Sequence, residues 1–497
     1  MLDSSAVDPR RFSLRGKKWK YRGEGNANLV LALPQERKIV RLRKCDGIGS
    51  NESEDVLAER EREHVWREAV FCRGIMVPLL GDSYIQPPTA ARMDRAEVRR
   101  LDQTVRTQRP IHRHHKSLQF GYVTVYPDYA LLPLQLSLSG MELRPTFCVE
   151  VKPKQGWVPM ADRRMSKCTY CLNQYLKLKN GSIRHQSGYC PLDLFSGNRI
   201  RMMKALRALV SAPQNNLKIF QDGVLVYGEE VGSDLGTVLR CWFGESLDIS
   251  SLIDRMCSLV LEALTRDLTG RDKLSDSETD ESDSDIAVWE RGCQGLLRPT
   301  SLPNGYDTSG HRAVGTSLTE RIPSALVTAV TPLLPEPPCD WTVETLSTDC
   351  ILGRILRMQK LDRTGADRVY DAFRSRTRRG GNDYGYVAGM LSAGTGAGPG
   401  LSPLHRYLLA TTAKDCSIMM AFQRLLEHDW GRIPDKHVVR DLDGQPYVMN
   451  VGVTDLDPKP LSCIEKHRKR DCEVLAACLE LLRPKTESDS NATCLTS

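Results

Sequence analysis

The chain has 497 residues and a formal net charge of +7, so it is long enough for two to four lobes, and its basic excess fits an anionic ligand. Its 16 cysteines are scattered, no apolar signal segment precedes them and no stretch predicts a transmembrane helix, which disfavours secreted and membrane-spanning proteins and favours the reducing cytoplasm, the nucleus or both. Aromatic residues make up only 6% and are not interleaved with the basic runs, which disfavours nucleic-acid binding.

Branched apolar residues predict strands at 28–33 and 37–42, joined by a turn that contains proline. Before the first strand, the segment YRGEGNANLVLAL places Gly23 and Gly25 where backbone N–H groups can approach phosphates closely. The third glycine of a dinucleotide fingerprint is missing, because Asn28 stands there. A plain hairpin turn therefore competes with the phosphate-binding interpretation.

The second of these strands carries Arg41 where a kinase-like lobe needs a cation against nucleotide phosphates, although a solvated strand cation would look the same. Helical spacing predicts a charged surface helix at 53–71, and residues 121–132 predict a further strand that runs into a Pro-Asp turn. Between them, the basic loop around Arg113 contains three histidines. We expect this loop to face an anion or solvent rather than a metal ion.

The segment FCVEVKPKQGW, residues 147–157, predicts a buried strand that ends in a stiff turn. Glu150 is the one acid within the apolar run. Lys152 and Lys154 stand on either side of Pro153, which fixes φ and limits how the two lysines can move. A solvated strand end is the competing interpretation, but two lysines held in this way suit a polyanionic ligand.

The next motif is a cluster of potential metal ligands. Cys168, Cys171, His185 and Cys190 form the pattern C-x₂-C-x₁₃-H-x₄-C, which is close to the spacing of structural zinc sites. Zinc would crosslink this loop and hold Lys177 in place. Reduced buried thiols with an incidental histidine are the alternative, and a redox function is disfavoured because no thioredoxin-like pattern surrounds the cysteines.

An acidic segment, residues 275–285, separates two ordered parts of the chain. Six of the ten residues from Asp276 on are acidic and are interleaved with Ser and Thr, so this run cannot bury enough apolar surface to fold. We expect disorder to extend to about Pro338, and a second flexible, glycine-rich insert at 385–401. Helical and strand patterns occur at 196–223, 252–268, 348–376, 404–415, 416–422 and 446–457, before a final helix and a polar tail.

Two aspartates stand at the ends of neighbouring elements. Asp415 ends a helix and opens a strand, and Asp455 ends the strand that follows. Phosphoryl transfer needs one carboxylate to accept the proton of the attacking hydroxyl and another to hold Mg²⁺ against the nucleotide. A cap or turn explains one such aspartate, but less readily two with Lys414 and Lys459 beside them. A short basic face at 465–471 is typical of a nuclear-import signal or of a solvated surface.

Together these motifs resemble the inositol-pentakisphosphate 2-kinases. The matching segments, spread from residue 21 to residue 460, are YRGEGNANLVLA, FCVEVKPKQGW, YCPLDLFSGN, PQNNLKIFQDG, TAKDCSIMMAF and DLDPKP. The resemblance implies an α+β fold of two lobes, the inositol phosphate kinase fold, which is distantly like that of protein kinases. It also implies ATP-dependent phosphorylation of the axial 2-hydroxyl of inositol 1,3,4,5,6-pentakisphosphate to give inositol hexakisphosphate, or phytate.

The resemblance also implies roles for individual residues. On the nucleotide these are Gly23, Glu24, Gly25, Asn26, Ala27, Asn28, Arg41, Asp128 in a hinge turn at 127–129, and Glu150. On the inositol phosphate they are Arg113, Lys152, Lys154, Lys177, Asn215, Asn216 and Lys459. Asp415 is implied as the catalytic base and Asp455 as the Mg²⁺ ligand. Past Lys459 some members use an arginine and a tyrosine; without gaps, Cys463 and His467 stand there, so those contacts are not carried over.

The expected organisation follows from these segments. We expect an N-lobe at 1–133, the first part of a C-lobe at 134–268, a disordered linker at 269–340, the rest of the C-lobe at 341–480 and a disordered tail at 481–497. We expect a monomer that binds ATP, Mg²⁺ and a structural zinc ion. A non-catalytic binder of inositol phosphates or nucleic acid through the same basic surface is the alternative, and a scaffold acting through the acidic segment is a third.

Overall fold

The computed structural model describes residues 10–46, 53–137, 144–229, 231–244, 248–269, 324–344, 346–377, 384–394, 401–429 and 431–483. The acidic segment at 275–285 therefore lies outside the described residues, as does most of the expected tail. Within the described ranges, none of the helices has both the length and the apolar character that crossing a membrane requires.

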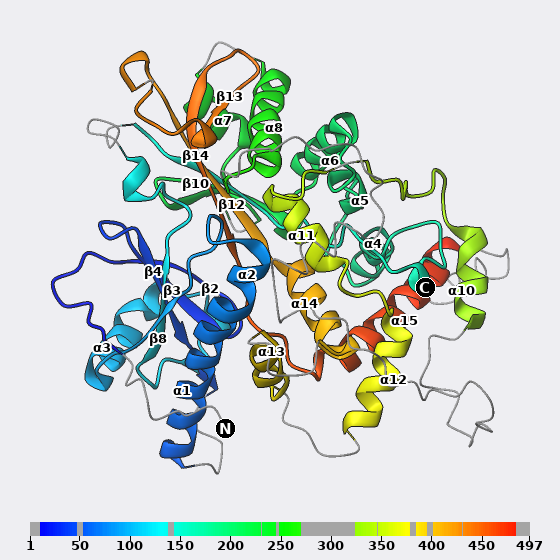
Figure 1. Ribbon diagram of the computed structural model, residues 1–497, viewed down its shortest axis with the longest axis horizontal. Helices are drawn as coiled ribbons and strands as arrows, with labels where there is room; N and C mark the ends of the chain where they lie inside the picture. Colours follow the sequence, from blue (N-terminus) through cyan, green and yellow to red (C-terminus); the bar gives the residue numbers. More distant parts are fainter. Residues whose placement is uncertain are drawn as a thin grey trace, which may run out of the picture.

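The N-terminal sheet has six strands in the order β1-β6-β8-β4-β3-β2 (Figure 1). They are β1 (Arg10–Arg11), β2 (Lys20–Glu24), β3 (Asn28–Leu33), β4 (Lys38–Arg43), β6 (Thr89–Arg92) and β8 (Tyr122–Pro127), and a separate pair is formed by β5 (Cys45–Asp46) and β7 (Lys116–Ser117). Because side chains alternate along a strand, Leu31 and Val40 share one face, where they pack with Leu101 of helix α3 (Arg95–Val105). The strands predicted in this part of the chain are confirmed.

Helix α1 (Glu54–Phe71) confirms the helix predicted at 53–71 and packs against β6 and β8 of this sheet. A π-turn, η1 (Cys72–Met76), and helix α2 (Val77–Leu80) continue the same helical run. Ile75 and Leu79, in this continuation, are fully buried in the core of the C-terminal sheet rather than in that of the N-terminal sheet. The helical run therefore joins the two halves of the molecule.

The C-terminal sheet also has six strands, in the order β11-β10-β9-β12-β14-β13, and all neighbouring strands are antiparallel. They are β9 (Phe147–Val151), β10 (Leu217–Gln221), β11 (Val224–Tyr227), β12 (Ser417–Arg424), β13 (Val438–Arg440) and β14 (Pro446–Thr454). Strand β12 lies in the middle and is buried at every position except Arg424. The strands expected at 147–157, 416–422 and 446–457 thus form the centre of one sheet.

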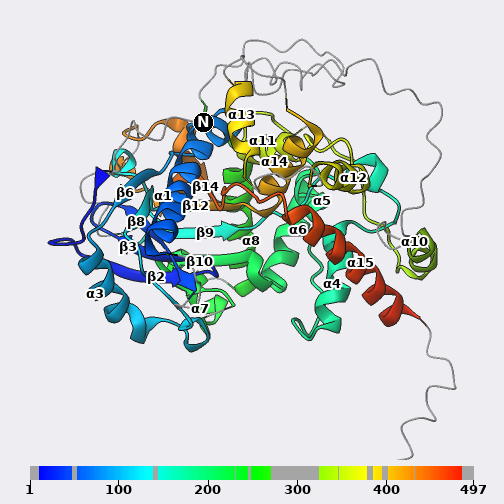
Figure 2. The ribbon, with the colours of Figure 1, turned by 90° about the horizontal axis from the view of Figure 1, so that it is seen from below.

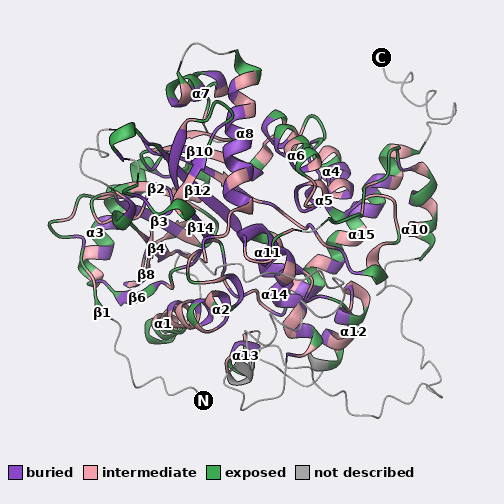
Figure 3. Cartoon of the chain, turned by 45° about the horizontal axis from the view of Figure 1, so that its top comes forward, coloured by how far each residue is buried: buried purple, intermediate pink, exposed green. Residues whose placement is uncertain are grey.

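Helices surround this sheet. They are α4 (Thr169–Lys179), α5 (Pro191–Leu194), α6 (Arg199–Ser211), α7 (Leu235–Phe243), α8 (Ile249–Thr265), α10 (Ser324–Val330), α11 (Ile351–Gln359), α12 (Ala366–Thr377), α13 (Tyr386–Gly394), α14 (Pro403–Asp415) and α15 (Cys463–Leu482). Figure 2 shows α15 running beside α4, away from the N-terminal sheet. Figure 3 shows buried residues concentrated on β12, α8, α11 and α14, so the main core lies between the sheet and these helices. The architecture is mixed α+β, as expected.

Two segments that we expected to be disordered carry ordered structure. Helix α10 lies within the expected linker, and its Val330 is fully buried against Val474 and Leu475 of α15. Helix α13 lies within the expected glycine-rich insert, and its Met390 is fully buried in the main core. The prediction of disorder is wrong for these parts because short apolar runs, which do not stabilise a helix by themselves, are buried by distant helices.

A buried cluster of charges holds the end of β2 in place. The carboxylate of Glu24 accepts hydrogen bonds from Lys44 and Arg109, and all three side chains are 0% exposed. Lys44 also donates to the carbonyl of Gly25 at 2.5 Å, and Arg109 donates to the carbonyl of Lys116 at 2.8 Å. The carboxylate of Glu24 thus compensates both cations, and Asp102 lies 3.5 Å from Nη1 of Arg109 as a second, more distant carboxylate.

Removing this carboxylate should destabilise the fold. In Glu24→Gln the buried Lys44 loses its counter-charge and Arg109 keeps only the more distant Asp102, so we expect the free energy of unfolding to fall by about 3–5 kcal/mol. Denaturation by urea, followed by tryptophan fluorescence, measures the change.

Glu36→Gln is the matched control for this prediction. Glu36 pairs with Lys17 at 2.8 Å, but their side chains are 29% and 34% exposed, so we expect a loss of about 0.2–1 kcal/mol. Equal effects of the two substitutions would contradict the importance of the buried cluster.

Candidate active site

The antiparallel strands β9, β12 and β14 bring the predicted site residues to one edge of the C-terminal sheet. Val151 pairs with Ile418, and Ile418 pairs with Val453 on the other side. Lys152 follows β9, Asp415 lies just before β12, and Asp455 follows β14. Lys154 and Asp415 are 261 residues apart in sequence, and Lys152 and Asp455 are 303 residues apart, yet each pair meets in space.

One group of contacts at this edge surrounds Asp455. Its Oδ2 lies 2.8 Å from Nζ of Lys152 and accepts a hydrogen bond of 3.0 Å from the hydroxyl of Ser417. The same hydroxyl lies 2.8 Å from Oε1 of Glu150. Burial lowers the pKa of Lys152, but the charge and hydrogen bond of Asp455 outweigh this effect and the pKa is raised, so the lysine stays charged. Ser417 was missed because nothing in its local sequence distinguishes it from a buried strand residue.

A second group of contacts surrounds Asp415, the last residue of α14. Its carboxylate lies 3.1 Å from Nζ of Lys459 and 3.4 Å from Nζ of Lys154. Burial raises the pKa of Asp415, but the charges of Lys459, Lys154 and Lys152 outweigh burial, so the pKa lies below its ordinary value. The carboxylate is therefore ionised near neutral pH, as a proton acceptor must be.

The Lys-Pro-Lys turn is held by contacts that the sequence does not reveal. Lys154 has φ of 61°, a left-handed conformation that costs a non-glycine residue about 1–2 kcal/mol. Gln359 of α11, which is fully buried, donates to the carbonyl of Lys154 at 2.9 Å and accepts from the N–H of Gly156 at 2.8 Å. Tyr189 donates to the carbonyl of Pro153 at 2.7 Å. The turn is thus fixed by buried hydrogen bonds as well as by the proline ring.

A cavity of about 1160 Å³ opens beside Asp415. Six of the predicted catalytic and substrate-binding residues line it, namely Lys154, Lys177, Asn215, Asn216, Asp415 and Lys459. Lys177, on α4, donates a hydrogen bond to Gln214, and burial together with the charges of Lys154 and Arg470 lowers its pKa. The side chain of Asn216 is buried and donates to Tyr170 at 3.1 Å, whereas Asn215 is exposed. The expected substrate-side residues therefore converge, except that Lys152 and Arg113 are not part of this lining.

Arg41 connects the two halves of the molecule. It lies 2.8 Å from the carboxylate of Glu68 on α1 and forms two hydrogen bonds, of 3.0 and 2.7 Å, with that of Asp457. Burial alone would raise the pKa of Asp457, but the charge of Arg41 outweighs it and the pKa is lowered. Asp457 is the second acid of DLDPKP, so the motif itself was the signal for this residue, but its partner lies 416 residues away.

The glycine loop between β2 and β3 is open on its outer side. A Cβ atom at Gly23 or Gly25 would meet nothing within 4 Å, and Gly23 has φ of 148°, which favours glycine. The N–H of Gly25 donates to the carbonyl of Asn28 at 2.9 Å, and that of Lys44 donates to the carbonyl of Ala27 at 2.8 Å. The loop is thus held by its backbone while its surface stays accessible.

Two residues expected on the nucleotide have other partners. The carboxylate of Glu24 is enclosed by the buried cluster described above, which leaves its backbone, and not its carboxylate, for the predicted nucleotide contact. Asp128 is buried, forms an ion pair with Arg22 and accepts the N–H of Ala130 at 3.1 Å. The N-terminal loop arginine, Arg113, reaches the side chain of Asn26 at 3.5 Å.

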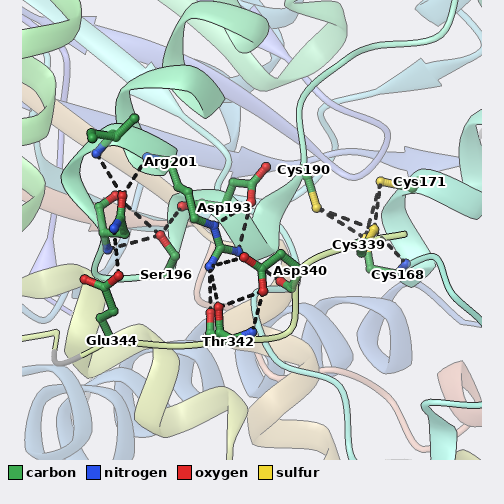
Figure 4. A network of polar contacts seen from close by, with 12 residues as sticks. Cys168, Cys171, Cys190, Asp193, Ser196, Arg201, Cys339, Asp340, Thr342 and Glu344 are labelled. Atoms are coloured by element: carbon green, nitrogen blue, oxygen red, sulfur yellow. Dashed lines mark hydrogen bonds and ion pairs between the residues drawn. The ribbon is translucent and has the colours of Figure 1, made fainter. Parts of the chain in front are cut away.

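The cysteine cluster differs from its predicted composition. Cys168, Cys171, Cys190 and Cys339 place their sulfur atoms within 4.8 Å of one another (Figure 4). His185 is exposed and is not in this group, so its prediction as a ligand is wrong. The reason is that Cys339 follows α10 and folds back from the other side of the acidic segment.

The four sulfur atoms fit a tetrahedral metal ion. Their recorded separations are 3.5, 3.8, 3.9 and 3.9 Å, and a ZnS₄ tetrahedron with Zn–S of about 2.3 Å has edges of about 3.8 Å. Four thiolates leave no open position, which is typical of structural rather than catalytic zinc. Zinc bound here would crosslink α4 to the segment after α10.

Protein contacts also hold the segment that carries Cys339. Arg201 of α6 donates to the carbonyls of Asp340 at 2.9 Å and Thr342 at 2.8 Å, and Asn198 donates to Glu344 at 2.7 Å (Figure 4). These hydrogen bonds thus position Cys339 independently of a metal ion.

Comparison with known proteins agrees with this geometry. The sequence profile of the family described as inositol-pentakisphosphate 2-kinase matches residues 21–473. The chain is 27% identical to an inositol-pentakisphosphate 2-kinase of Danio rerio and 25% identical to one of Arabidopsis thaliana, in both cases over 92% of this chain and 92% of the relative. It is 28% identical to one of Drosophila melanogaster over 45% of this chain and 51% of the relative.

The ion pairs of Asp415 predict a pH effect. In Lys459→Met one of the charges that lower the pKa of Asp415 is lost, so we expect this pKa to rise and the carboxylate to become protonated at higher pH than in the unchanged protein. A carbon-13 NMR titration of the aspartate carboxyl groups, assigned with Asp415→Asn, measures the pKa. Lys436→Met, at a lysine that donates to the carbonyl of Leu268 at 3.1 Å, should leave it unchanged. A pKa of Asp415 that does not move in Lys459→Met would contradict the pairing.

The cysteine cluster predicts which residue holds the metal. We expect Cys339→Ser to weaken zinc binding at least about 10-fold, because one thiolate of the tetrahedron is lost. Competition with a chromogenic chelator measures the affinity. His185→Ala should bind zinc as the unchanged protein does, and the reverse pattern would restore the ligand set first predicted from sequence.

Proposed function

The chain belongs to the inositol-pentakisphosphate 2-kinase family, and we propose that it transfers the γ-phosphate of ATP to the 2-hydroxyl of inositol 1,3,4,5,6-pentakisphosphate, which gives inositol hexakisphosphate. The observation that carries this proposal is the convergence of Lys154, Lys177 and Lys459 on one cavity beside the ionised carboxylate of Asp415. A polyanion would be bound by the lysines while the aspartate faces its one unphosphorylated hydroxyl.

The charge of the substrate supports this assignment. At about 1.5 to 2 negative charges per phosphate, five phosphates carry roughly −8 to −10, which requires cations from several elements. The lysines come from the turn after β9, from α4 and from the segment after β14, and Asn215 adds a neutral donor. Arg113, on the loop beside the glycine loop, would bring the N-terminal half onto the substrate.

On the nucleotide side, we assign the loop from Gly23 to Asn28 to the phosphates through its backbone and Arg41 through its guanidinium. The turn at Asp128 would lie under the adenine, and Glu150 would stand beside the nucleotide. Asp455, with the hydroxyl of Ser417 and the carboxylate of Glu150 next to it, offers the oxygen donors that Mg²⁺ prefers. Mg²⁺ bound there would neutralise charge on the nucleotide phosphates.

Proton transfer is assigned to Asp415. Its carboxylate would accept the proton of the attacking hydroxyl, a contribution of about 10²–10⁴-fold in rate. Lys154 and Lys459 would hold the adjoining phosphates, so that the hydroxyl and the γ-phosphorus are aligned. Most of the acceleration would come from this positioning and from neutralisation of charge, as is general for phosphoryl transfer.

We also propose a distant relationship to protein kinases. It is supported by Arg41 on β4, which pairs with Glu68 of α1 at 2.8 Å, because protein kinases pair a sheet cation with a helix glutamate beside the nucleotide phosphates. The arginine in place of lysine would allow the second, two-point contact with Asp457.

The experiment that tests the function is one incubation with ATP, Mg²⁺ and a panel of inositol phosphates, with the products resolved by isomer. We expect inositol hexakisphosphate from inositol 1,3,4,5,6-pentakisphosphate. Asp415→Asn should lower kcat by about 10²–10⁴-fold, because the proton acceptor is lost, while the affinity for the substrate is kept. Calorimetric titration measures that affinity.

Glu427→Gln is the control, because Glu427 is an exposed acid outside the cavity. Normal turnover by Asp415→Asn would refute the assignment of the base. Binding of inositol pentakisphosphate by the unchanged protein without turnover of any member of the panel would favour the non-catalytic binder instead.

A further inference from the structure

The first turns of α15 face the cavity that we assign to the inositol phosphate. Cys463, Lys466, His467 and Arg470 line it, and residues three or four apart share one face of a helix. Two cations, Lys466 and Arg470, therefore lie on the helix face that borders the cavity.

His467 itself adds no positive charge to this face of α15. Its Nδ1 lies 2.9 Å from the hydroxyl of Tyr407, and its ring is partly buried. Burial, together with the charges of Lys414 and Lys459, lowers the pKa of His467 to about 4, so the ring is neutral near pH 7. We call this face of α15, formed by Cys463, Lys466, His467 and Arg470, the wall of the cavity. Its positive charge therefore comes from Lys466 and Arg470.

The side chain of Arg470 is held against helix α4. Its Nε and Nη2 lie 3.3 and 3.0 Å from Oδ1 of Asn173 on α4. Asn173 precedes Lys177 by one helical turn, so the guanidinium lies near the ammonium group expected to bind a substrate phosphate. The two cations repel one another, and Glu229, which also lines the cavity, offsets only part of this repulsion at Lys177, so an anion that contacts both cations would be favoured.

Three of the acids that line the cavity are paired with other cations. Asp362 lies 3.7 Å from Lys414, and Asp367 pairs with Arg164 at 2.5 Å and with Arg468. On α15 itself, Glu473 lies 4.0 Å from Lys469. Neither Lys466 nor Arg470 has a carboxylate within ion-pair distance among the residues that the structure describes.

We propose that Lys466 and Arg470 bind phosphate groups of the inositol phosphate and thereby favour a highly phosphorylated substrate over one with fewer phosphates. The inference rests on the proposed function for the identity of the ligand. Arg470 suits two-point contact with a phosphate, and its bond to the neutral Asn173 leaves its charge uncompensated. Lys466, one turn nearer the start of α15, extends the same positive surface toward Lys459. The basic face at 465–471 thus acquires a function besides the two considered from sequence.

The test uses the full chain with Lys466→Ala, Arg470→Ala and the double substitution. We expect each single substitution to raise the KM for inositol pentakisphosphate about 10-fold, the loss expected for one charge-assisted phosphate contact, and the double substitution to raise it further. The KM for ATP and the kcat should stay within about two-fold, since the nucleotide side is untouched. An inositol trisphosphate should lose less affinity than the pentakisphosphate, because fewer of its phosphates reach this wall.

Arg483→Ala is the matched control. Arg483 caps the end of the same helix, is exposed and lies outside the cavity, so its loss changes the net charge by the same amount without touching the wall. Variants at 466 and 470 that behave like Arg483→Ala would overturn the inference. Arg470→Gln, which keeps a hydrogen-bonding side chain near Asn173, replaces Arg470→Ala if the latter melts at a lower temperature than the unchanged protein.

Calorimetric binding separates this inference from the proposed function. If the unchanged protein binds inositol pentakisphosphate but transfers no phosphate, the proposed reaction is refuted. In that case, weaker binding by the double variant still supports the inference that Lys466 and Arg470 bind phosphate groups. If the unchanged protein phosphorylates the substrate and the double variant binds it equally well, the inference about Lys466 and Arg470 is refuted, whereas the proposed reaction is supported.

Discussion

The position of β12 between β9 and β14 is the constraint on which the site depends. The antiparallel register that pairs Ile418 with both Val151 and Val453 brings three chain segments to the same edge of the sheet. A shift of one residue in β12 would turn Ser417 to the opposite face and remove the link between Glu150 and Asp455. Because every position of β12 except its last is buried, both of its faces are packed, so such a shift would also exchange the side chains that fill the two sides of the core; packing therefore fixes the geometry of the site.

The local patterns of the sequence were sufficient for most of the elements and for singling out Lys152, Lys154 and Asp415, whereas most of the other substrate-side residues were implied only by the family resemblance. Strand periodicity, the proline between Lys152 and Lys154 and the aspartate after α14 are all properties of short segments. Their convergence could be expected only because the segments resemble a family; nothing in the spacing itself brings Lys177 of α4 to the same cavity as Lys459.

The contacts that escaped prediction are those between distant segments. Cys339 lies 168 residues from Cys171, Gln359 lies 205 residues from Lys154, and Asp457 lies 416 residues from Arg41. Each is an ordinary residue of its own segment and gains its function only from the partner that folding places beside it. The same reasoning explains the two helices found in segments expected to be disordered, since the burial of an apolar run depends on what packs against it.

Among the residues that the structure describes, four cations of the site are, unlike Lys466 and Arg470, already paired with carboxylates. Lys154 and Lys459 are held by Asp415, Lys152 is held by Asp455, and Arg41 is held by Asp457. On the proposed function, binding is therefore an exchange in which phosphate oxygens replace carboxylate oxygens.

This exchange connects binding with chemistry. The lysines lower the pKa of Asp415, and phosphates that neutralise the lysines reverse part of that effect. The carboxylate then gains affinity for a proton when the hydroxyl that must lose one is beside it. Without substrate, the same lysines keep Asp415 ionised. When the polyanion binds the lysines, the proton affinity of the carboxylate rises, and Asp415 can accept the proton of the hydroxyl.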